Sequence, residues 1–351
     1  MRIPVVWSPA TKQHVPKHEV WVGVPTPGTE LPERVDVVLE ALAGHPLHEA
    51  TTHDDDVLRA VHDDDFLQHL AHIAREWAQG PYDELVGQDR VVPYVFATEA
   101  MLAGMPPTAP AATHARAGTY CYDTMTLVGP GTWEAARAAV DVALTAVDLV
   151  LAGERTAYAL CRPPGHHVTP RGYGGSCYLN NAAVAAEALR AAGHERVAVI
   201  DVDAHHGNGT QAVFWERPDV RYGSLHVDPA AGWFPHLFGH ASETGGGAGA
   251  GATRNLPLPE GTGDGPWVAA VADLAAWVSD CDALVVSLGV DAAGDDPESP
   301  LQVTADGFRA AGRVLGDLGV PSVVVQEGGY DLAHLGALVA AYLGGHASTA
   351  D

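Results

Sequence analysis

The chain has few cysteines, few positive charges and no long apolar segment. Its four cysteines are scattered and form no CxxC pair, which argues against a disulfide framework and favours a reducing compartment. Only 19 lysines and arginines stand against 44 aspartates and glutamates, and the formal charge of −25 disfavours nucleic acid as a partner. A run of about 18 apolar residues, which a membrane helix requires, is missing. Residues 1–7 also lack the apolar core of a secretory signal, so we expect a cytoplasmic protein with no membrane partner.

The excess of acidic residues has two interpretations. It attracts a cationic small molecule by long-range electrostatics. It also keeps a protein soluble in a crowded or salty cytoplasm, without any role in substrate binding.

Strand-like and helix-like segments alternate along the chain. The strand-like segments are apolar and β-branched, and they cover Thr156–Cys161, Val197–Ile200, Val220–His226, Ala283–Leu288 and Pro321–Gln326. Alanine-rich helical segments cover Thr132–Ala152, Asn181–Ala192, Trp267–Ser279 and Ala305–Leu318. This alternation predicts an α/β fold with a central, mostly parallel sheet and helices on both faces. No linker divides residues 1–351, so we expect a single domain with a long insertion loop at about 80–118.

Polar clusters follow four of the predicted strands. The most informative is Asp201-Val202-Asp203-Ala204-His205, where alternate side chains of an extended backbone point to the same side. Asp291 follows the strand-like segment Ala283–Leu288. Because the carboxyl ends of parallel strands meet at one edge of a sheet, Asp203, His205 and Asp291 should lie together. Two carboxylates and an imidazole with an open fourth position fit a catalytic zinc ion.

Two further strand ends supply groups for proton transfer and oxyanion binding. His166 and His167 are adjacent, so their side chains diverge and do not easily bind one metal together. Asp201 and Asn208 are their natural partners, and a charged and a neutral partner would divide acid and base roles. Tyr330 follows two glycines, so its hydroxyl can reach over the metal and donate to an oxyanion. Any one of these residues alone could equally be a hydrogen-bonded core residue.

The motifs resemble those of the histone deacetylase superfamily, and most closely its bacterial acetylpolyamine amidohydrolases. The matching segments span about two hundred residues in the expected order, and they are Pro130–Glu134, Cys161–His167, Asn180–Val184, Asp201–Gln211, Ser224–His226 with Asp228-Pro229, Ser287–Asp291 and Glu327–Tyr330. The most specific are the strings Arg-Pro-Pro-Gly-His-His and Asp-x-Asp-x-His-His-Gly-Asn-Gly-Thr.

The resemblance implies an arginase-deacetylase fold and metal-dependent hydrolysis of an N-acyl amide. It makes Asp203, His205 and Asp291 the ligands of one Zn²⁺ per chain, although Fe²⁺ is not distinguished from it. His166 becomes the general base paired with Asp201, His167 an acid or electrostatic partner held by Asn208, and Tyr330 the group that polarises the carbonyl. Structural K⁺ is implied near Asp201, Asp203, His205, Ser224 and Leu225, with a second site near Phe214, Arg217 and Val220. The branch forms homodimers in which the loop matching 80–118 shapes the active-site mouth.

The substrate channel departs from the family pattern. An aromatic residue that forms one wall is replaced by Ser176, beside Gly175, while the opposite wall is kept as Phe234 with Trp233 next to it. Glu19 matches one of the acidic residues at the mouth of polyamine-specific relatives. Where others are expected, the stretch 114–125 offers His114, Arg116 and Met125.

The sequence therefore predicts a zinc-dependent amidohydrolase acting on an acetylated polyamine or another acyl-amine. A bulkier natural-product or acyl-lysine substrate is an alternative within the same chemistry. A binuclear manganese ureohydrolase is less favoured, because one Asp-x-Asp-x-His motif with Asp291 supplies too few bridging carboxylates. A catalytically dead binding module is disfavoured by the presence of both histidines and Tyr330.

Overall fold

The computed structural model describes residues 2–82, 89–106, 108 and 110–348. Within them, one sheet has the strand order β4-β1-β5-β10-β9-β6-β7-β8, and all its strand pairs are parallel. The bounds are β1 Val5–Trp7, β4 Leu47–Glu49, β5 Thr156–Ala159, β6 Val197–Asp201, β7 Val220–Val227, β8 Thr253–Leu258, β9 Ala283–Leu288 and β10 Ser322–Gln326. The predicted parallel sheet is confirmed, and the strands β1, β4 and β8 were not predicted.

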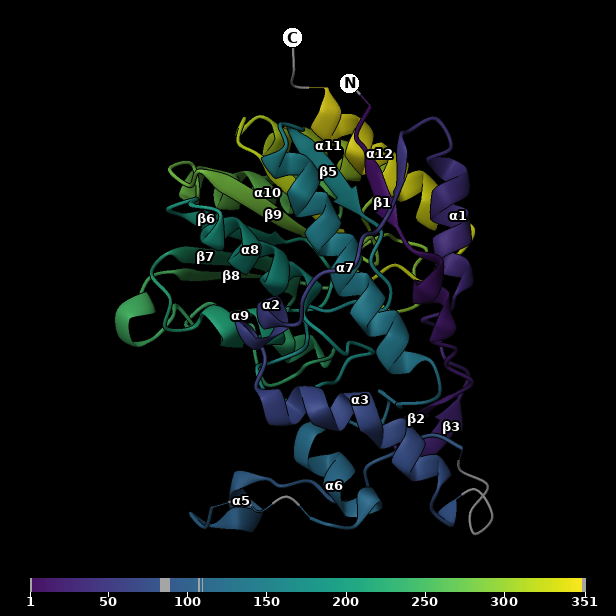
Figure 1. The fold of residues 1–351 in the computed structure, drawn as a ribbon. Coiled ribbons are helices and arrows are strands. Elements are labelled where there is room, and N and C mark those ends of the chain that lie inside the picture. The colour runs from purple at the N-terminus through teal and green to yellow at the C-terminus, as the bar shows by residue number, and fades with distance from the viewer. Residues whose placement is uncertain (1, 83–88, 107, 109, 349–351) are drawn as a thin grey trace.

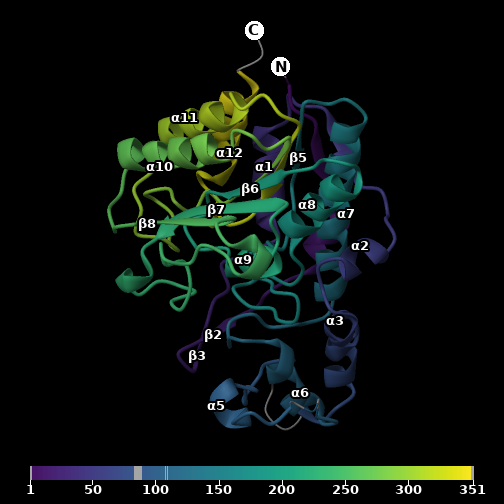
Figure 2. The same cartoon turned by 90° about the vertical axis from the view of Figure 1, so that its left-hand side faces the viewer.

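Helices cover both faces of the sheet, as predicted (Figures 1 and 2). One face carries α1 (Glu33–Ala41), α10 (Asp264–Trp277), α11 (Ala305–Gly316) and α12 (Leu335–Ala347). The other carries α7 (Thr132–Leu151) and α8 (Asn181–Ala191). No helix in the described part of the chain has both the length and the apolar character needed to cross a membrane.

The alternation of side chains along the strands divides the core into two layers. In β6, Val197 and Val199 join the cluster that packs under α7 and α8, whereas Ala198 and Ile200 join the cluster under α10, α11 and α12. Helices cover both faces of the sheet here, so each of these side chains is fully buried. Two-sided burial explains why the sequence reads as a continuous apolar run rather than an alternating one.

A second group of elements lies beyond the carboxyl edge of the sheet (Figure 1). It contains the antiparallel pair β2 (Glu19–Trp21) and β3 (Val24–Thr26), with α2 (Asp56–Arg59), α3 (Asp64–Ala78), α5 (Glu99–Leu102), α6 (Thr113–Tyr120) and α9 (Asn208–Phe214). The insertion expected at 80–118 includes α5 and the start of α6, while its residues 83–88, 107 and 109 lie outside the described part. Short 3-10 helices cover Pro9–Gln13, Pro229–Ala231 and Gly247–Gly249.

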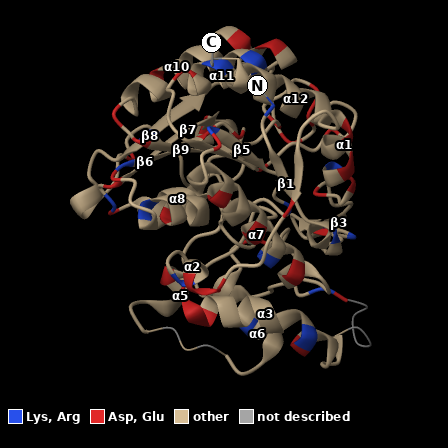
Figure 3. Ribbon diagram, turned by 45° about the horizontal axis from the view of Figure 1, so that its top comes forward, with Lys and Arg blue, Asp and Glu red and all other residues tan. Residues whose placement is uncertain are grey.

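Charge is distributed unevenly between the layers. Figure 3 shows Asp and Glu on the outer helices and on α2 and α3, while the central strands carry few charged residues. In strands β5, β6, β9 and β10 the charged residue is Asp201, which ends β6 and is fully buried. Strands β5, β10, β9 and β6 are consecutive neighbours in the sheet, so the four predicted polar clusters emerge side by side at one edge.

Candidate active site

Asp203, His205 and Asp291 converge as the sequence predicts. One ligand atom from each lies within 4.8 Å of the others. His205 Nδ1 is 2.9 Å from Asp291 Oδ2 and 3.2 Å from Asp203 Oδ1. The first two residues follow β6 and the third follows β9, and these strands are paired in register from Val197 and Ala283 onward.

The remaining oxygens of the two carboxylates are fixed by backbone donors. Gly328 N donates to Asp203 Oδ2 at 2.8 Å, and Ala204 N donates to Asp291 Oδ1 at 2.9 Å. Gly328 approaches so closely that a Cβ there would lie 2.5 Å from Asp291 Oδ2. The framework therefore holds one oxygen of each carboxylate toward the nitrogen of His205.

The electrostatics of this group fit a bound cation. Burial, together with the charge of Asp203, raises the pKa of Asp291 to about 8. Negative charge buried at one point is costly unless it is paired or bound to a metal. Two carboxylates and an imidazole are a donor set that Zn²⁺ accepts.

His166 and Asp201 form a buried pair beside the candidate ligands. The Nδ1 of His166 lies 3.0 Å from Asp201 Oδ2, which also accepts a hydrogen bond from the hydroxyl of Tyr222 at 3.1 Å. Because an ionised carboxylate only accepts, Nδ1 carries the proton and Nε2 is left toward Asp203, 3.9 Å from its Oδ1. Burial favours the neutral ring, but the charges of Asp201 and Asp203 outweigh it and raise the pKa of His166 to about 10.

His167 has the opposite electrostatic environment. Its Nδ1 lies 2.8 Å from Asn208 Oδ1, at the first residue of α9, and that neutral partner adds no charge. Burial, followed by the positive charge of His166, holds the pKa of His167 well below its usual value. The ring centroids of the two histidines are 4.1 Å apart. The predicted partners are therefore in place, one charged and one neutral.

Tyr330 is held by its backbone and by its ring. Its N–H donates to Asp296 Oδ2 at 2.6 Å, and the guanidinium of Arg34 lies 5.0 Å from its ring centroid. Arg34 also donates from Nε to the carbonyl of Gly329 at 2.7 Å, in a turn where Gly329 has φ +119°. Burial raises the pKa of Tyr330 well above its usual value despite the opposing effect of Arg34, so the hydroxyl stays a donor.

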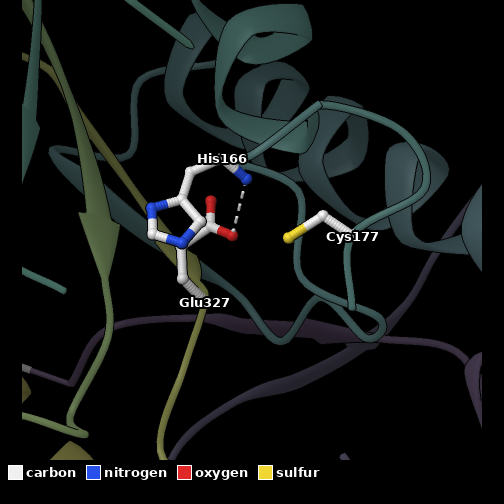
Figure 4. Close-up of side chains that lie close together, drawn as sticks. All are labelled: His166, Cys177 and Glu327. Carbon is white, nitrogen blue, oxygen red and sulfur yellow. Dashed lines mark hydrogen bonds between the residues drawn. The ribbon is translucent and has the colours of Figure 1, made fainter. Parts of the chain in front are cut away.

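His166, Cys177 and Glu327 form a second compact group of side chains (Figure 4). Glu327 Oε2 accepts hydrogen bonds from the backbone N–H of Gly165 at 2.7 Å and of His166 at 3.2 Å. Burial raises the pKa of the Cys177 thiol well above its usual value, and His166 Nδ1 is already bound to Asp201. These contacts suit a framework that positions the backbone of His166, and sequence reasoning assigned no role to Glu327.

A cavity of about 70 Å³, the inner cavity, opens over these groups. Its lining residues are Glu19, Thr29, Met125, His167, Gly175, Ser176, His205, Phe234, Glu298 and Tyr330. All four predicted substrate-binding residues are present, namely Glu19, Gly175, Ser176 and Phe234. A Cβ at Gly175 would lie 2.3 Å from the ring of His167, so this wall requires glycine.

The sequence did not point to Glu298, and it left the role of Trp233 open. Glu298 lies in the loop after β9 and lines the inner cavity together with the predicted Glu19. Burial, followed by the charge of Glu298, raises the pKa of Glu19 to about 7. The available signal was the run of acidic residues that begins at Asp295. Trp233 packs against the core layer under α10 and lines neither cavity, so it does not close the space beside Ser176.

A much larger space, the outer cavity, adjoins the inner one. It measures about 1150 Å³ and shares Met125 and Phe234 with the inner cavity. Apolar side chains from β2, from the insertion and from the loop after β7 make up much of its wall, including Val20, Trp21, Val22, Phe96, Leu237 and Phe238.

Comparison with known proteins supports the same chemistry. The family described as the histone deacetylase domain matches residues 28–345. Acetylpolyamine amidohydrolase of Mycoplana ramosa is 38% identical over 346 residues, which cover 97% of this chain and 98% of that protein. A namesake from Burkholderia pseudomallei (strain 1710b) is 42% identical over 320 residues, or 90% of each chain. The crystal structure of acetylpolyamine aminohydrolase from Burkholderia pseudomallei superimposes with a TM-score of 0.93 at 38% identity, covering 99% of both chains.

Proposed function

Because the chain belongs to the histone deacetylase family and is a hydrolytic deacetylase of amide bonds, we propose that its substrate is an N-acetylated polyamine. The observation that carries this proposal is the pair Glu19 and Glu298 in the wall of the inner cavity. Two carboxylates there favour a substrate whose second nitrogen is protonated. The names of the relatives above point to the same substrate class.

The family is zinc-dependent, and Asp203, His205 and Asp291 would hold the ion. When bound, Zn²⁺ supplies Lewis acidity for the amide carbonyl and for the attacking water. We assign one ion per chain, with Fe²⁺ as the alternative metal. Structural K⁺ near Ser224 and Leu225, and near Phe214 and Val220, is a further proposal that rests on the family resemblance alone.

The residues of the chain divide the proton transfers. Because a cation bound beside Asp203 would offset the negative charge that raises the pKa of His166, His166 would then take a proton from the attacking water at Nε2, while Asp201 keeps its Nδ1 protonated. Tyr330 donates its hydroxyl proton in a hydrogen bond to the oxygen that becomes negative. An imidazolium, of His166 or His167, then protonates the leaving amine nitrogen, and Asn208 orients the His167 ring for this role.

Acetate release provides the test of this function. The metal-loaded protein should release acetate from N-acetylputrescine much faster than from N-pentylacetamide, in which a methyl group replaces the ammonium group. Equal rates on both amides would reject the polyamine assignment while leaving the deacetylase activity intact.

A bulkier acyl-amine is the second candidate. Ser176 leaves one side of the inner cavity open, and the apolar outer cavity lies beyond Phe234. Faster hydrolysis of acetanilide than of N-acetylputrescine would favour this candidate.

We also propose a homodimer of single-domain protomers in which the insertion at 80–118 takes part. Tyr94, Met101 and Met105 on the insertion are each at least 60% exposed, and exposed apolar residues of this kind are typical of interfaces. The four cysteines are buried free thiols, which supports a cytoplasmic location. Sedimentation as a monomer at micromolar concentration would contradict the dimer.

A further inference from the structure

We propose that Glu243 and Gln211 are positioning residues that fix Phe234 and thereby set the width of the acyl-amine channel. The inference rests on the proposed deacetylase function and adds a specificity mechanism to it. It concerns the Phe234 loop, defined as residues 232–243, which connects the end of β7 to the segment before β8.

One carboxylate ties this loop to the framework. Glu243 Oε2 accepts hydrogen bonds from Gly239 N at 3.0 Å and from Gln211 Nε2 at 2.7 Å. The amide oxygen of Gln211 in turn accepts from Asn255 Nδ2 at 2.7 Å and lies 3.0 Å from His206 Nε2. Gln211 and Asn255 are buried on α9 and β8, so the far end of the network is rigid.

A second bond holds the same glycine from the other side. His226 Nε2 lies 2.8 Å from the carbonyl oxygen of Gly239, and because a carbonyl oxygen only accepts, Nε2 is the donor. The other ring nitrogen of His226, Nδ1, then accepts a hydrogen bond from the hydroxyl of Ser224 at 2.8 Å. Gly239 has φ +97°, and a Cβ there would lie 2.5 Å from His226 Nε2. Both the N–H and the carbonyl of Gly239, five residues beyond Phe234, are therefore hydrogen-bonded to side chains outside residues 232–239.

Core packing holds the Phe234 loop on one side of Phe234, at Trp233. On the other side Leu237 is 76% exposed and Phe238 is 45% exposed, so hydrogen bonds rather than core packing fix that part of the loop. Phe234 itself meets the ring of His167 edge-on, with centroids 4.8 Å apart and planes at 88°. It also separates the inner cavity from the outer cavity, because it lines both.

Helix α9 joins these contacts to the catalytic group. Asn208, which orients His167, and Gln211, which holds the loop through Glu243, are three residues apart and lie on one face of the helix. The element that aligns His167 thus also places the aromatic wall against it. Loss of the Glu243 bond should let Phe234 move toward the outer cavity and widen the channel.

The test compares two substrates across matched variants. In Glu243→Ala, we expect KM for N-acetylputrescine to rise about fivefold with kcat within about twofold, since the hydrogen bonds from Gly239 and Gln211 to this carboxylate are lost. The ratio of kcat/KM for acetanilide to that for N-acetylputrescine should rise by a similar factor. Glu243→Gln retains an acceptor oxygen and should keep most of the preference for N-acetylputrescine over acetanilide. Glu216→Ala, an exposed glutamate outside the network, is the control and should leave the ratio unchanged.

A double-mutant cycle shows whether Glu243 acts through Phe234. If it does, Glu243→Ala should add no further change to the substrate ratio in a Phe234→Ala background. Amide hydrogen exchange of residues 232–243 should also be faster in Glu243→Ala than in Glu216→Ala. An equal change of the ratio in both backgrounds, or an equal loss of kcat/KM on both substrates, would overturn the proposal. Absence of acetate release by the unmodified protein would instead overturn the proposed function.

Discussion

The edge of the sheet and the mouth above it are built in contrasting ways. At the edge, Asp201, Asp203 and Asp291 are at most 1% exposed, and backbone or ring donors hold their oxygens. At the mouth, Trp21 is 62% exposed and Leu237 is 76% exposed, on segments that pack little against the core. The rigid edge is suited to chemistry that all substrates share, whereas the mouth is suited to selecting among them.

The largest effect should come from the edge. Asp291→Ala removes a carboxylate from the candidate metal site, so bound metal should fall from about one ion per chain to nearly none. Turnover should drop by about three orders of magnitude or more, because a catalytic metal supplies several kcal/mol. Elemental analysis measures the bound metal and acetate release measures turnover. Asp295→Ala, at an exposed aspartate of the same loop, is the matched control. Full metal content with normal turnover would refute the site.

Tyr330→Phe should also act at the edge, but without loss of metal. It removes one hydroxyl donor to the developing oxyanion, which typically costs about 10²–10³ in turnover. The backbone bond to Asp296 and the contact with Arg34 do not depend on the hydroxyl, so the fold should persist. A kcat within about twofold of the unmodified protein would exclude this role for Tyr330.

The carboxylates at the mouth should affect substrate selection through their charge. Glu298→Gln removes one carboxylate from the inner cavity, so kcat/KM for N-acetylputrescine should fall about tenfold, the usual size for a bond to a charged group. Hydrolysis of neutral N-pentylacetamide should change little. Kinetics on the two amides measure the difference, and equal losses on both would contradict a cation-binding role.

Preference for the cationic substrate should depend on pH. The pKa of Glu19 is raised to about 7, first by burial and then by the charge of Glu298, so Glu19 loses its negative charge below that pH. The ratio of kcat/KM for N-acetylputrescine to that for N-pentylacetamide should therefore rise as the pH increases through about 7. Glu298→Gln removes the repelling charge and should move this midpoint to lower pH. A midpoint that stays in place would disprove the coupling.

The smallest effect concerns the open side of the channel. Ser176→Tyr should shift preference a few-fold from acetanilide toward N-acetylputrescine, because an added ring buries more of a linear chain. Ser176 has φ +59°, so the variant also tests whether a bulky residue is tolerated there. The measurement is the ratio of kcat/KM for acetanilide to that for N-acetylputrescine, in the unmodified protein and in Ser176→Tyr. An unchanged ratio would show that residue 176 does not set the width.

The same contrast explains how much of the molecule the sequence could predict. Strands β5, β6, β9 and β10 are buried on both sides, so each appears in the sequence as an apolar run followed by polar residues and could be predicted. The catalytic and metal-binding candidates at the ends of these strands converge in the structure. Strands β1 and β4 have only three residues each and carry too weak a pattern.

The mouth was harder because its residues are placed by loop contacts. Glu298 reaches the inner cavity through a loop whose path depends on Asp296, which accepts the N–H groups of Glu298, Tyr330 and Asp331. The bonds from Tyr330 and Asp331 join residues 34 and 35 positions away from Asp296, so the local pattern does not specify them. The sequence left open whether Trp233 compensates for Ser176, and the structure shows that it packs against the core layer instead.

One crossed measurement tests the division between edge and mouth most directly. It determines kcat/KM for N-acetylputrescine and N-pentylacetamide in the unmodified protein, in Tyr330→Phe and in Glu298→Gln. We predict that Tyr330→Phe lowers both values by the same factor, whereas Glu298→Gln lowers only the value for the charged substrate. Equal losses on both substrates in Glu298→Gln, or a selective loss in Tyr330→Phe, would contradict the account.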